Sequence, residues 1–480
     1  MPTPHHVRFS QLLPAGVAVL ALAGGARAQT APAVLTLREA VQEALAHNER
    51  ALLLEDGRED ADLAVRLARD AFQPKLLPTF SSAHGELASG QTLRLDVSQR
   101  LATGTEWRAG AGASLVAPLG PGSRGAPGGR SIQSDLALTV TQPLLRGFGT
   151  AATRRALSTS ELRRGDAERQ LRLGEQRLAV EVADAYYRLV TQKTMVTVAK
   201  AAVDRARQLQ EVAEVKLAAG LVSQLDVFRA LQLVTQAETQ LFDAEAAVDE
   251  ARDQMRVLMG RNSGAPFEVV AEIPSGVDHV DADTAIARAL DVRLDLQSAL
   301  AAAEDADLSV AAARNDLLPQ VDANLSLTRS GLGAALAGAS NRVNAAAFLT
   351  VALPVDRTPQ LTEFRRAQMD RERRQRSIDA LRRQIQEEVR RAIRARDRAA
   401  RTVAAADALV DIGKKEAEVA RLRYESGLSN NLDVVTAEGN LLAAEARRVA
   451  ALAERAALRW SLRAVMGTLD PRAVDREIAP

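Results

Sequence analysis

The chain has 480 residues, of which 26% are charged and only 3% aromatic, and its formal net charge is +1. This near balance gives no long-range attraction to nucleic acid, so we expect no nucleic-acid partner. The chain has no cysteine, which excludes thiol catalysis, disulfides and cysteine-based metal sites, and its five histidines are scattered. We therefore expect no cofactor and no metal, and nothing in the sequence favours an enzyme.

Residues 1–28 have the pattern of a secretory signal peptide. Arg8 supplies the positive charge, residues 12–22 form an apolar core, and Ala26-Arg27-Ala28 supplies the small-x-small cleavage site. A short membrane anchor is the alternative, but this apolar core falls well short of the roughly 20 residues that a spanning helix needs. The pattern predicts export, and no other stretch is apolar enough to cross a bilayer as a helix.

The rest of the chain is a tandem duplication. Residues 212–238 and 419–445 share ten of 27 positions at an offset of 207, including Gly220 and Gly427. Residues 59–63 are identical to residues 304–308, now at an offset of 245. The predicted division is a signal peptide (1–28), a first repeat (29–260), a linker (261–281), a second repeat (282–467) and a polar tail (468–480).

Each repeat begins with helices and continues with strands. Thr36, with Glu39 three residues later, predicts a capping box at the start of a helix, and a second helix is expected over 49–72, before Pro74. Strands are expected within about 75–142 and 319–354, where apolar and polar residues alternate. Alternating strands of about 9–11 residues suit a membrane barrel, and a soluble β-subdomain remains the alternative.

The first strand region is longer than the second. The offset between the repeats falls from 245 to 211 across it, so the first repeat carries 245 − 211 = 34 extra residues. This length suits one more hairpin, with its turn at 101–105. The extra hairpin either adds strands to the barrel or folds as an external or plugging hairpin.

The longest predicted element is a helix over 150–219, which contains no proline. Its apolar residues recur at spacings of 3, 4 and 7, and about 70 residues rising 1.5 Å each give about 100 Å. The returning helix, to Gly260, is only about half as long, so the 49–72 helix is expected to fill the gap end-on. The second repeat predicts the same pair over 361–426 and up to Gly467. The arginine-rich stretch 364–401 indicates a solvated, salt-bridged helix face.

These features together resemble the TolC family of outer-membrane efflux and secretion ducts. The resemblance is carried by the repeat, by the strand-to-helix junction 142–149 (QPLLRGFG), and by the tip pattern Tyr424-x-x-Gly427-x4-Leu432-Asp433-Val434. It implies a mainly α fold with a transmembrane β-barrel portion, in which tandem-duplicated long helical hairpins form a trimeric α-barrel tunnel. Each protomer would give four strands to a shared 12-stranded barrel, or six if the extra hairpin joins it.

The resemblance also implies the function. The protein would be a passive outer-membrane exit duct of a tripartite efflux or type I secretion system. Its partners would be two further copies of itself, outer-membrane lipid, a periplasmic adaptor (membrane fusion) protein and an inner-membrane transporter. A secreted or periplasmic coiled-coil adaptor or structural protein is the alternative. An adaptor would need one hairpin with lipoyl-like β-segments, which the sequence lacks.

Site residues follow from the two glycine turns. The resemblance places Leu432, Asp433 and Thr436 at the pore entrance, with Thr436 where a second acidic residue is common, so that the ring would hold three carboxylates. It pairs Tyr424 with Asp226 as an entrance latch. The adaptor-docking tips would be Gly220, Leu221, Val222, Gly427, Leu428 and Ser429, with Ser429 where an arginine sometimes stands.

From the residues alone, other roles stay open at these positions. Asp226 and Asp433 follow turns and suit N-caps of the returning helices. Tyr424 suits packing against the hairpin. Gly220 and Gly427 suit helix C-caps that need a positive φ.

Overall fold

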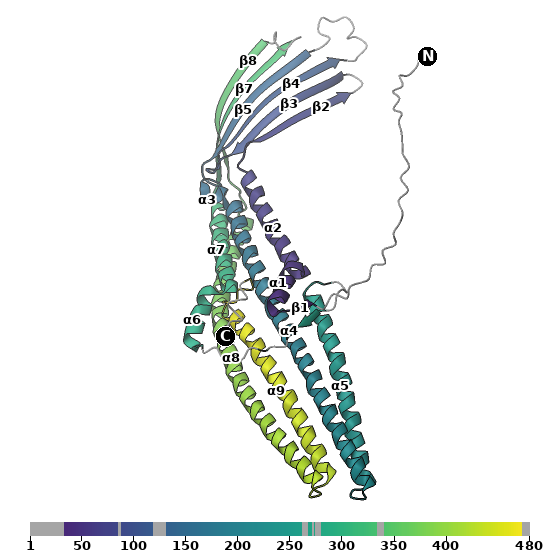
Figure 1. Cartoon of the computed structure of the whole chain (residues 1–480). Coiled ribbons are helices and arrows are strands. Elements are labelled where there is room, and N and C mark those ends of the chain that lie inside the picture. Colours follow the sequence, from purple (N-terminus) through teal and green to yellow (C-terminus); the bar gives the residue numbers. More distant parts are fainter. Residues whose placement is uncertain are drawn as a thin grey trace, which may run out of the picture.

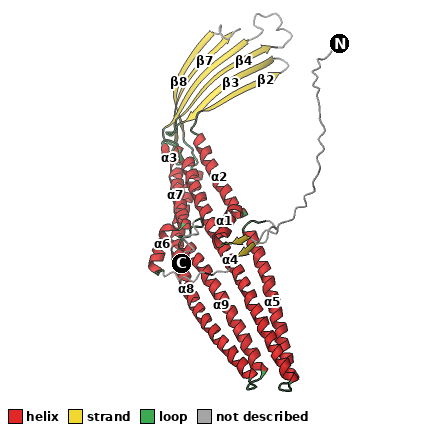
Figure 2. Ribbon diagram, viewed as in Figure 1, coloured by secondary structure: helices red, strands yellow, loops and turns green. Residues whose placement is uncertain are grey.

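A computed structural model of the chain describes residues 33–84, 88–118, 131–261, 267–270, 273, 280–333 and 340–472. The predicted signal peptide, most of the linker and the end of the polar tail lie outside the described residues. The described part is elongated, with a β-sheet at one end and the tips of two long helical hairpins at the other (Figures 1 and 2). None of the described helices is long and apolar enough to cross a membrane.

The helices follow the duplicated pattern. The first repeat contains α1 (Leu37–His47), α2 (Glu49–Asp70), α3 (Thr150–Thr153), α4 (Arg155–Ala218) and α5 (Gln224–Leu258). The second contains α6 (Ala282–Val292), α7 (Leu294–Asn315), α8 (Thr358–Glu425) and α9 (Asn431–Val465). Thr36 forms the predicted capping box with Glu39 at the start of α1. The helix predicted from Thr150 is interrupted at Arg154, and α8 begins before Leu361 because Pro359 is tolerated in a first turn.

The shorter helices pair with the long ones, as predicted for the first repeat. Both α2 and α5 pack along α4, and Asn48, at the α1–α2 junction, donates from Nδ2 to the carbonyl oxygen of Leu258 at 2.8 Å. This bond satisfies a carbonyl at the end of α5 and places α2 end-on to it. The second repeat has the same joint, where Arg293 Nη1 donates to the Val465 carbonyl oxygen at 3.3 Å. The helices are therefore continuous in space across both joints.

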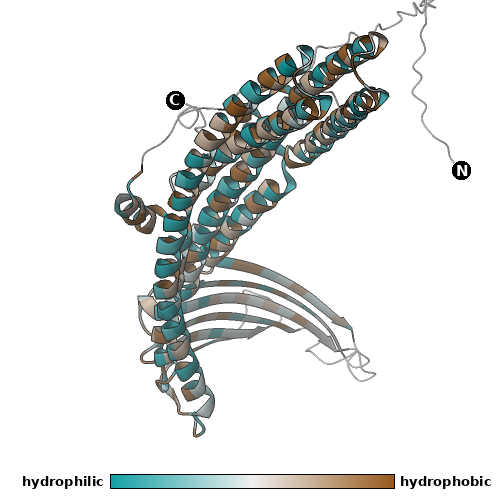
Figure 3. Ribbon diagram, turned by 90° about the horizontal axis from the view of Figure 1, so that it is seen from below, coloured by the Kyte–Doolittle hydropathy of each residue, from teal (hydrophilic) through white to brown (hydrophobic). Residues whose placement is uncertain are grey.

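The core is spread along the helices. Its largest cluster gathers buried residues of α1, the middle of α4, the end of α5 and the end of α9. A two-stranded sheet joins this cluster, in which β1 (Ala33–Leu35) pairs in parallel with β6 (Phe267–Val269). That sheet was not predicted from the sequence. Hydrophilic and hydrophobic residues alternate along all the long helices (Figure 3), which is the pattern of a wall with faces exposed to water.

The main sheet has six antiparallel strands. They are β2 (Lys75–His84), β3 (Ala88–Arg100), β4 (Glu106–Pro118), β5 (Ser131–Pro143), β7 (Gln320–Gly333) and β8 (Ser340–Ala352), in the order β2-β3-β4-β5-β7-β8. Within one chain the sheet is open, with β2 and β8 at its edges. Six strands pair in one sheet, which favours the alternative of six strands per protomer over the expected four. The extra hairpin is β3–β4, which turns at the predicted residues 101–105 and pairs within the sheet.

A candidate tunnel entrance at the hairpin tips

Both hairpin turns close on a glycine in the left-handed region. Gly220 has φ +69° and Gly427 has φ +77°, and an added Cβ would meet nothing within 4 Å at either position. The amides of Leu221 and Leu428 donate to the carbonyls of Lys216 and Arg423, at 2.9 Å and 2.8 Å. Both turns are therefore Schellman caps that need glycine for its φ, and the predicted role as C-caps is confirmed.

The turns expose apolar side chains to water. Leu221 is 72% exposed and Leu428 is 75% exposed, and they stand at equivalent positions of the two tips. Val222 is only partly buried and packs against the small tip cluster that contains Tyr424. Ser429 is half-buried beside Leu428. The two tips therefore present the same apolar side chain to water at equivalent places.

The returning helices are capped by residues other than the two aspartates. Ser223 is the N-cap of α5 and Asn430 is the N-cap of α9. Asp226 accepts bonds from the Ser223 amide and hydroxyl at 3.0 Å and 2.8 Å, completing a capping box, and the Asp433 amide donates to Asn430 Oδ1 at 3.2 Å. The N-cap alternative for Asp226 and Asp433 is therefore wrong, because each lies three residues inside its helix.

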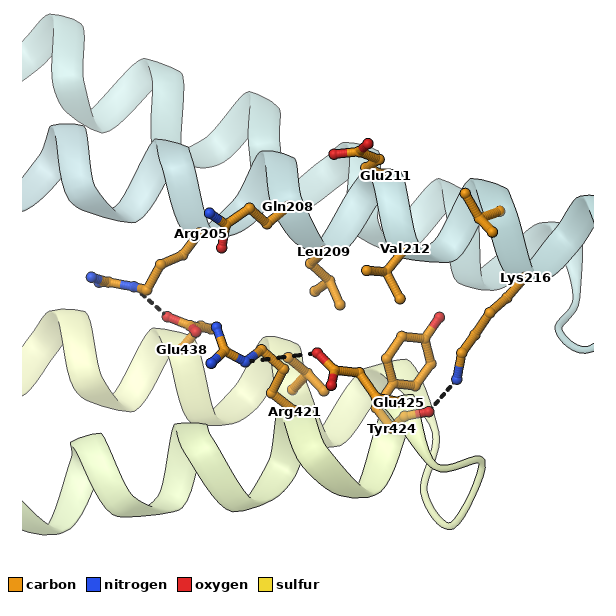
Figure 4. A pocket seen from close by; sticks show the side chains of 12 residues that line it. Arg205, Gln208, Leu209, Glu211, Val212, Lys216, Arg421, Tyr424, Glu425 and Glu438 are labelled. Carbon is orange, nitrogen blue, oxygen red and sulfur yellow. Dashed lines mark hydrogen bonds and ion pairs between the residues drawn. The ribbon is translucent and has the colours of Figure 1, made fainter.

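Tyr424 lies at the centre of the contact between the tips. It is 2% exposed and packs with Leu209 and Ala213 of α4, Ala230 of α5 and Val434 of α9. Lys216 of α4 lies over its ring, with Nζ 4.3 Å from the ring centroid, and donates to its backbone carbonyl (Figure 4). The tyrosine thus joins the two hairpins through apolar packing and a cation–π contact.

The predicted latch between Tyr424 and Asp226 forms no hydrogen bond in this structure. The phenolic oxygen of Tyr424 is buried with no hydrogen-bond partner. The carboxylate of Asp226 faces Ser223 and lies 3.7 Å from Arg229. The two groups still act on each other, since burial and then the negative charge of Asp226 raise the pKa of the Tyr424 phenol.

Asn431 makes the polar link between the tips that the sequence did not reveal. Its side chain is fully buried, and Nδ2 donates to the backbone carbonyl oxygen of Asp226 at 2.6 Å. The bond joins the start of α9 to the first turn of α5. Nothing in the sequence distinguished Asn431 from Asn430, because both follow a turn and both are suited to capping.

The three predicted entrance residues lie exposed on the first turns of α9. Leu432, Asp433 and Thr436 are all exposed, and the Thr436 hydroxyl donates to the Leu432 carbonyl at 2.8 Å. The threonine hydroxyl is thus engaged with its own helix. Asp433 is the one carboxylate among the three. Among the described residues, no group of three or more His, Asp or Glu is placed to hold a metal.

Above the tips, charged residues join the hairpins. Arg205 of α4 contacts Glu438 at 2.7 Å and Glu445 at 3.5 Å, both from α9, and all three side chains are largely buried. A cleft of about 540 Å³ lies between α4 and the second hairpin, lined by Arg205 and Glu438 at one end and by Lys216 and Tyr424 at the other (Figure 4). The contact between the two hairpins near their tips is therefore polar at both ends and apolar between.

Comparison with known proteins gives the class. The model of the outer membrane efflux protein family matches residues 40–261 and 285–468, and the chain belongs to that family. It is therefore a protein of the outer membrane.

Solved structures share the fold across nearly the whole chain. The outer-membrane channel OprN superposes with a TM-score of 0.69 at 18% identity, covering 90% of each chain. VceC from Vibrio cholerae gives 0.67 at 17% identity, covering 90% of this chain and 96% of its own. The CmeC outer-membrane channel of Campylobacter jejuni gives 0.65 at 16% identity, covering 92% and 89%.

One curated relative matches over a shorter stretch. The fusaric acid resistance protein FusA of Burkholderia cepacia is 33% identical over 121 residues, which is 25% of this chain. The chain spans only 22% of that relative's length.

Proposed function

We propose that the protein is a passive exit duct of a tripartite efflux or type I secretion system, working as a homotrimer without catalysis or cofactor. Three copies would surround a continuous path from the hairpin tips to the outer surface. A periplasmic adaptor and an inner-membrane transporter would deliver cargo at the tips. Energy would come from the transporter.

The observation that carries the proposal is the separation of two unlike ends in one chain. At one end, the sheet exposes apolar side chains such as Leu93 and Leu136, which are 61% and 51% exposed. At the other end, α4 and α5 meet in a hairpin tip that carries both polar and apolar residues. The helix α4 alone spans about 64 × 1.5 Å, roughly 95 Å. A lipid-facing sheet joined to long water-exposed helices supports a duct over a soluble adaptor.

The tip residues have proposed roles within this duct. Asp433 would give a ring of three carboxylates at the entrance, with Leu432 and Thr436 beside it. The exposed Leu221 and Leu428 would contact the helical hairpin of an adaptor, as a helix lays its apolar face into a groove. Opening would separate the two hairpins at Tyr424, and an adaptor that binds the separated form better would favour it.

For cargo, small toxic molecules are the first class to test. The partial relative is named for fusaric acid resistance, which supports efflux ahead of protein secretion. Cells that lack their own outer-membrane efflux duct, supplied with this chain and its transporter and adaptor, should regain resistance to such compounds. Unchanged resistance, together with restored secretion of a protein cargo, would move the assignment to type I secretion.

The duct itself is tested by location and assembly. We expect the full chain to appear in the outer-membrane fraction as trimers that resist sodium dodecyl sulfate until heated, and to conduct ions in planar bilayers. A monomer in the periplasmic fraction would contradict the proposal and favour the coiled-coil structural alternative.

A further inference from the structure

We propose that the β3–β4 hairpin forms part of the membrane wall, so that three copies close a barrel of 18 strands, with β8 of one copy paired to β2 of the next. This inference rests on the trimeric duct proposed above. Beyond that duct, it specifies the strand edges through which neighbouring copies pair and the width of the exit.

The hairpin is an insertion between two strands that the repeats share. β2 follows Pro74 as β7 follows Pro319, and β5 ends at Pro143 in the place where β8 is followed by Pro354. In the second repeat the two shared strands pair directly with each other. In the first, β3 and β4 lie between them and pair over most of their length with β2 and β5. The inserted strands therefore widen the sheet by two strands.

The inserted strands continue the apolar face of the sheet. Leu93 and Leu95 of β3 lie opposite Ala113 and Ala111 of β4, which lie opposite Ser134 and Leu136 of β5. Leu93 and Leu95 are both exposed, as is Leu136. A hairpin lying in the lumen or outside the membrane has water on both faces and needs no such alternation. The matching face indicates that the inserted strands contact lipid as the shared strand β5 does.

On the opposite face an ion pair crosses β4. Arg94 of β3 contacts Asp96 at 2.9 Å and reaches over β4 to Asp135 of β5 at 3.1 Å. Gly110 and Gly112 lie beneath it, and a Cβ at either position would come within 2.5 Å of a carboxylate oxygen. The two glycines leave room for the side chains, and the ion pair fastens the inserted strand β3 to the shared strand β5.

The turn of the hairpin is fastened to the helix junction. Gly104 has φ +94°, and a Cβ there would lie 2.7 Å from the Gly147 carbonyl oxygen. The Gly149 amide donates to the Thr103 carbonyl at 3.2 Å, and Thr105 is hydrogen-bonded to Gln142. The hairpin is thus held at its turn as well as along its strands, in a position that belongs to the sheet.

The two edge strands of the sheet, β2 and β8, indicate that its partner is another copy of this chain. Strand edges that face lipid leave backbone groups without hydrogen bonds, and six strands are fewer than the eight of the smallest closed barrels. β2 and β8 are the edges of one sheet, so pairing β8 with β2 of a neighbouring copy repeats around a ring and leaves no edge. Three copies give 3 × 6 = 18 strands. Barrel diameter grows roughly linearly with strand number, so this exit is about half as wide again as one of 12 strands.

Single cysteines test where the hairpin lies, since the chain has none of its own. The variants are Leu95→Cys and Ser98→Cys on β3, with Leu138→Cys and Thr139→Cys on β5 as matched controls for the apolar and polar faces. With trimers in lipid vesicles and a membrane-impermeant maleimide, we expect Ser98→Cys and Thr139→Cys to react. Leu95→Cys and Leu138→Cys should react only after the protein is unfolded. Reaction of Leu95→Cys in intact vesicles, with Leu138→Cys still protected, would overturn the inference.

Paired cysteines test the closure. Thr79→Cys on β2 is combined in turn with Ala346→Cys, Phe348→Cys or Thr350→Cys, three positions on the corresponding face of β8. Under oxidation, one combination should give covalently linked trimers. Trimers that form normally but cross-link in none of the three combinations would overturn the closure and leave the duct standing. An absence of trimers would defeat the proposed function itself.

Discussion

Asn431 donates a hydrogen bond from Nδ2 to the backbone carbonyl oxygen of Asp226 at 2.6 Å, and so ties the start of α9 to the first turn of α5. The donor belongs to the second repeat and the acceptor to the first. The equivalent positions do not form the reverse bond, because Gln224 stands where Asn431 stands and is exposed. The link between the tips is therefore built from unlike copies of the same turn.

Removing this donor should loosen the tips. Asn431→Ala removes the side-chain hydrogen bond to the Asp226 carbonyl, at a cost of about 1 kcal/mol to the contact between the tips. We expect a higher single-channel conductance in planar bilayers than for the wild type. Asn440→Ala, on the exposed face of the same helix, is the control and should conduct as the wild type does. Equal conductance in both variants would show that the bond does not hold the entrance.

Lys216 should hold the entrance through Tyr424. Lys216→Met keeps a long side chain but removes the charge over the ring and the donor to the Tyr424 carbonyl, so it should raise conductance. Lys200→Met removes an exposed lysine from the same helix, where the nearest carboxylate oxygen of Glu245 is 3.8 Å away, and should have little effect. If the two variants behave alike, the cation–π contact is not part of the gate.

The phenol of Tyr424 should ionise at a higher pH than that of an ordinary tyrosine. Burial and then the charge of Asp226 raise its pKa above the usual value of about 10. The neutral phenol is thus favoured when the tips are closed, and closure should weaken as the pH rises through the raised pKa. The difference in phenolate absorbance between the wild type and Tyr424→Phe isolates this group.

Asp226→Asn should lower that pKa only in part, since burial remains. A Tyr424 pKa that falls to about 10 in Asp226→Asn would show instead that the charge, and not burial, is the main cause.

Asp433 should set ion preference if it lines the entrance. A ring of carboxylates concentrates cations, so Asp433→Asn should reduce the preference for cations over anions, measured as the reversal potential in a salt gradient. Thr436→Asp adds a second ring one turn further on and should increase that preference. Unchanged reversal potentials in both variants would place this face of α9 away from the pore.

The end-on joint of the helices should depend on Gly260. It has φ +68°, and a Cβ there would lie 2.4 Å from the His47 carbonyl oxygen, so Gly260→Ala should lower the melting temperature of the trimer. Gly57→Ala is the matched control, because Gly57 lies inside α2 with nothing within 4 Å. It should raise stability by about 0.5–1 kcal/mol. A melting temperature unaffected by Gly260→Ala would show that the joint can open without cost.

The periodic parts of the chain were predictable from sequence. The 207-residue offset located both hairpins, the capping box at Thr36 located α1, and alternation located the strands. The 34-residue surplus predicted a hairpin with the correct turn at 101–105. Its place in the sheet depends on pairings with β2 and β5, and alternation alone does not specify which strands are neighbours.

The contacts between elements were harder to predict. Lys216 and Asn431 act on residues of the other repeat, and no local spacing relates positions so far apart in the chain. β1 and β6 are only three residues each, too short for a period to be visible. Asp226 and Asp433 were placed near the right turns, but their distance from the cap depended on where each helix begins, which sequence patterns locate to within a few residues.

The junction of sheet and helices limits how such a chain can lengthen. β2 begins and β5 ends at the helical side of the sheet, so an inserted segment has to return the chain to the side from which it left. In the proposed barrel, one added strand would leave the polypeptide on the far side of the membrane, with the 64 residues of α4 still to be placed. Strands can therefore be gained only in even numbers per chain. One hairpin, such as β3–β4, is therefore the smallest insertion that widens the proposed barrel and still leaves every later helix on the helical side of the sheet.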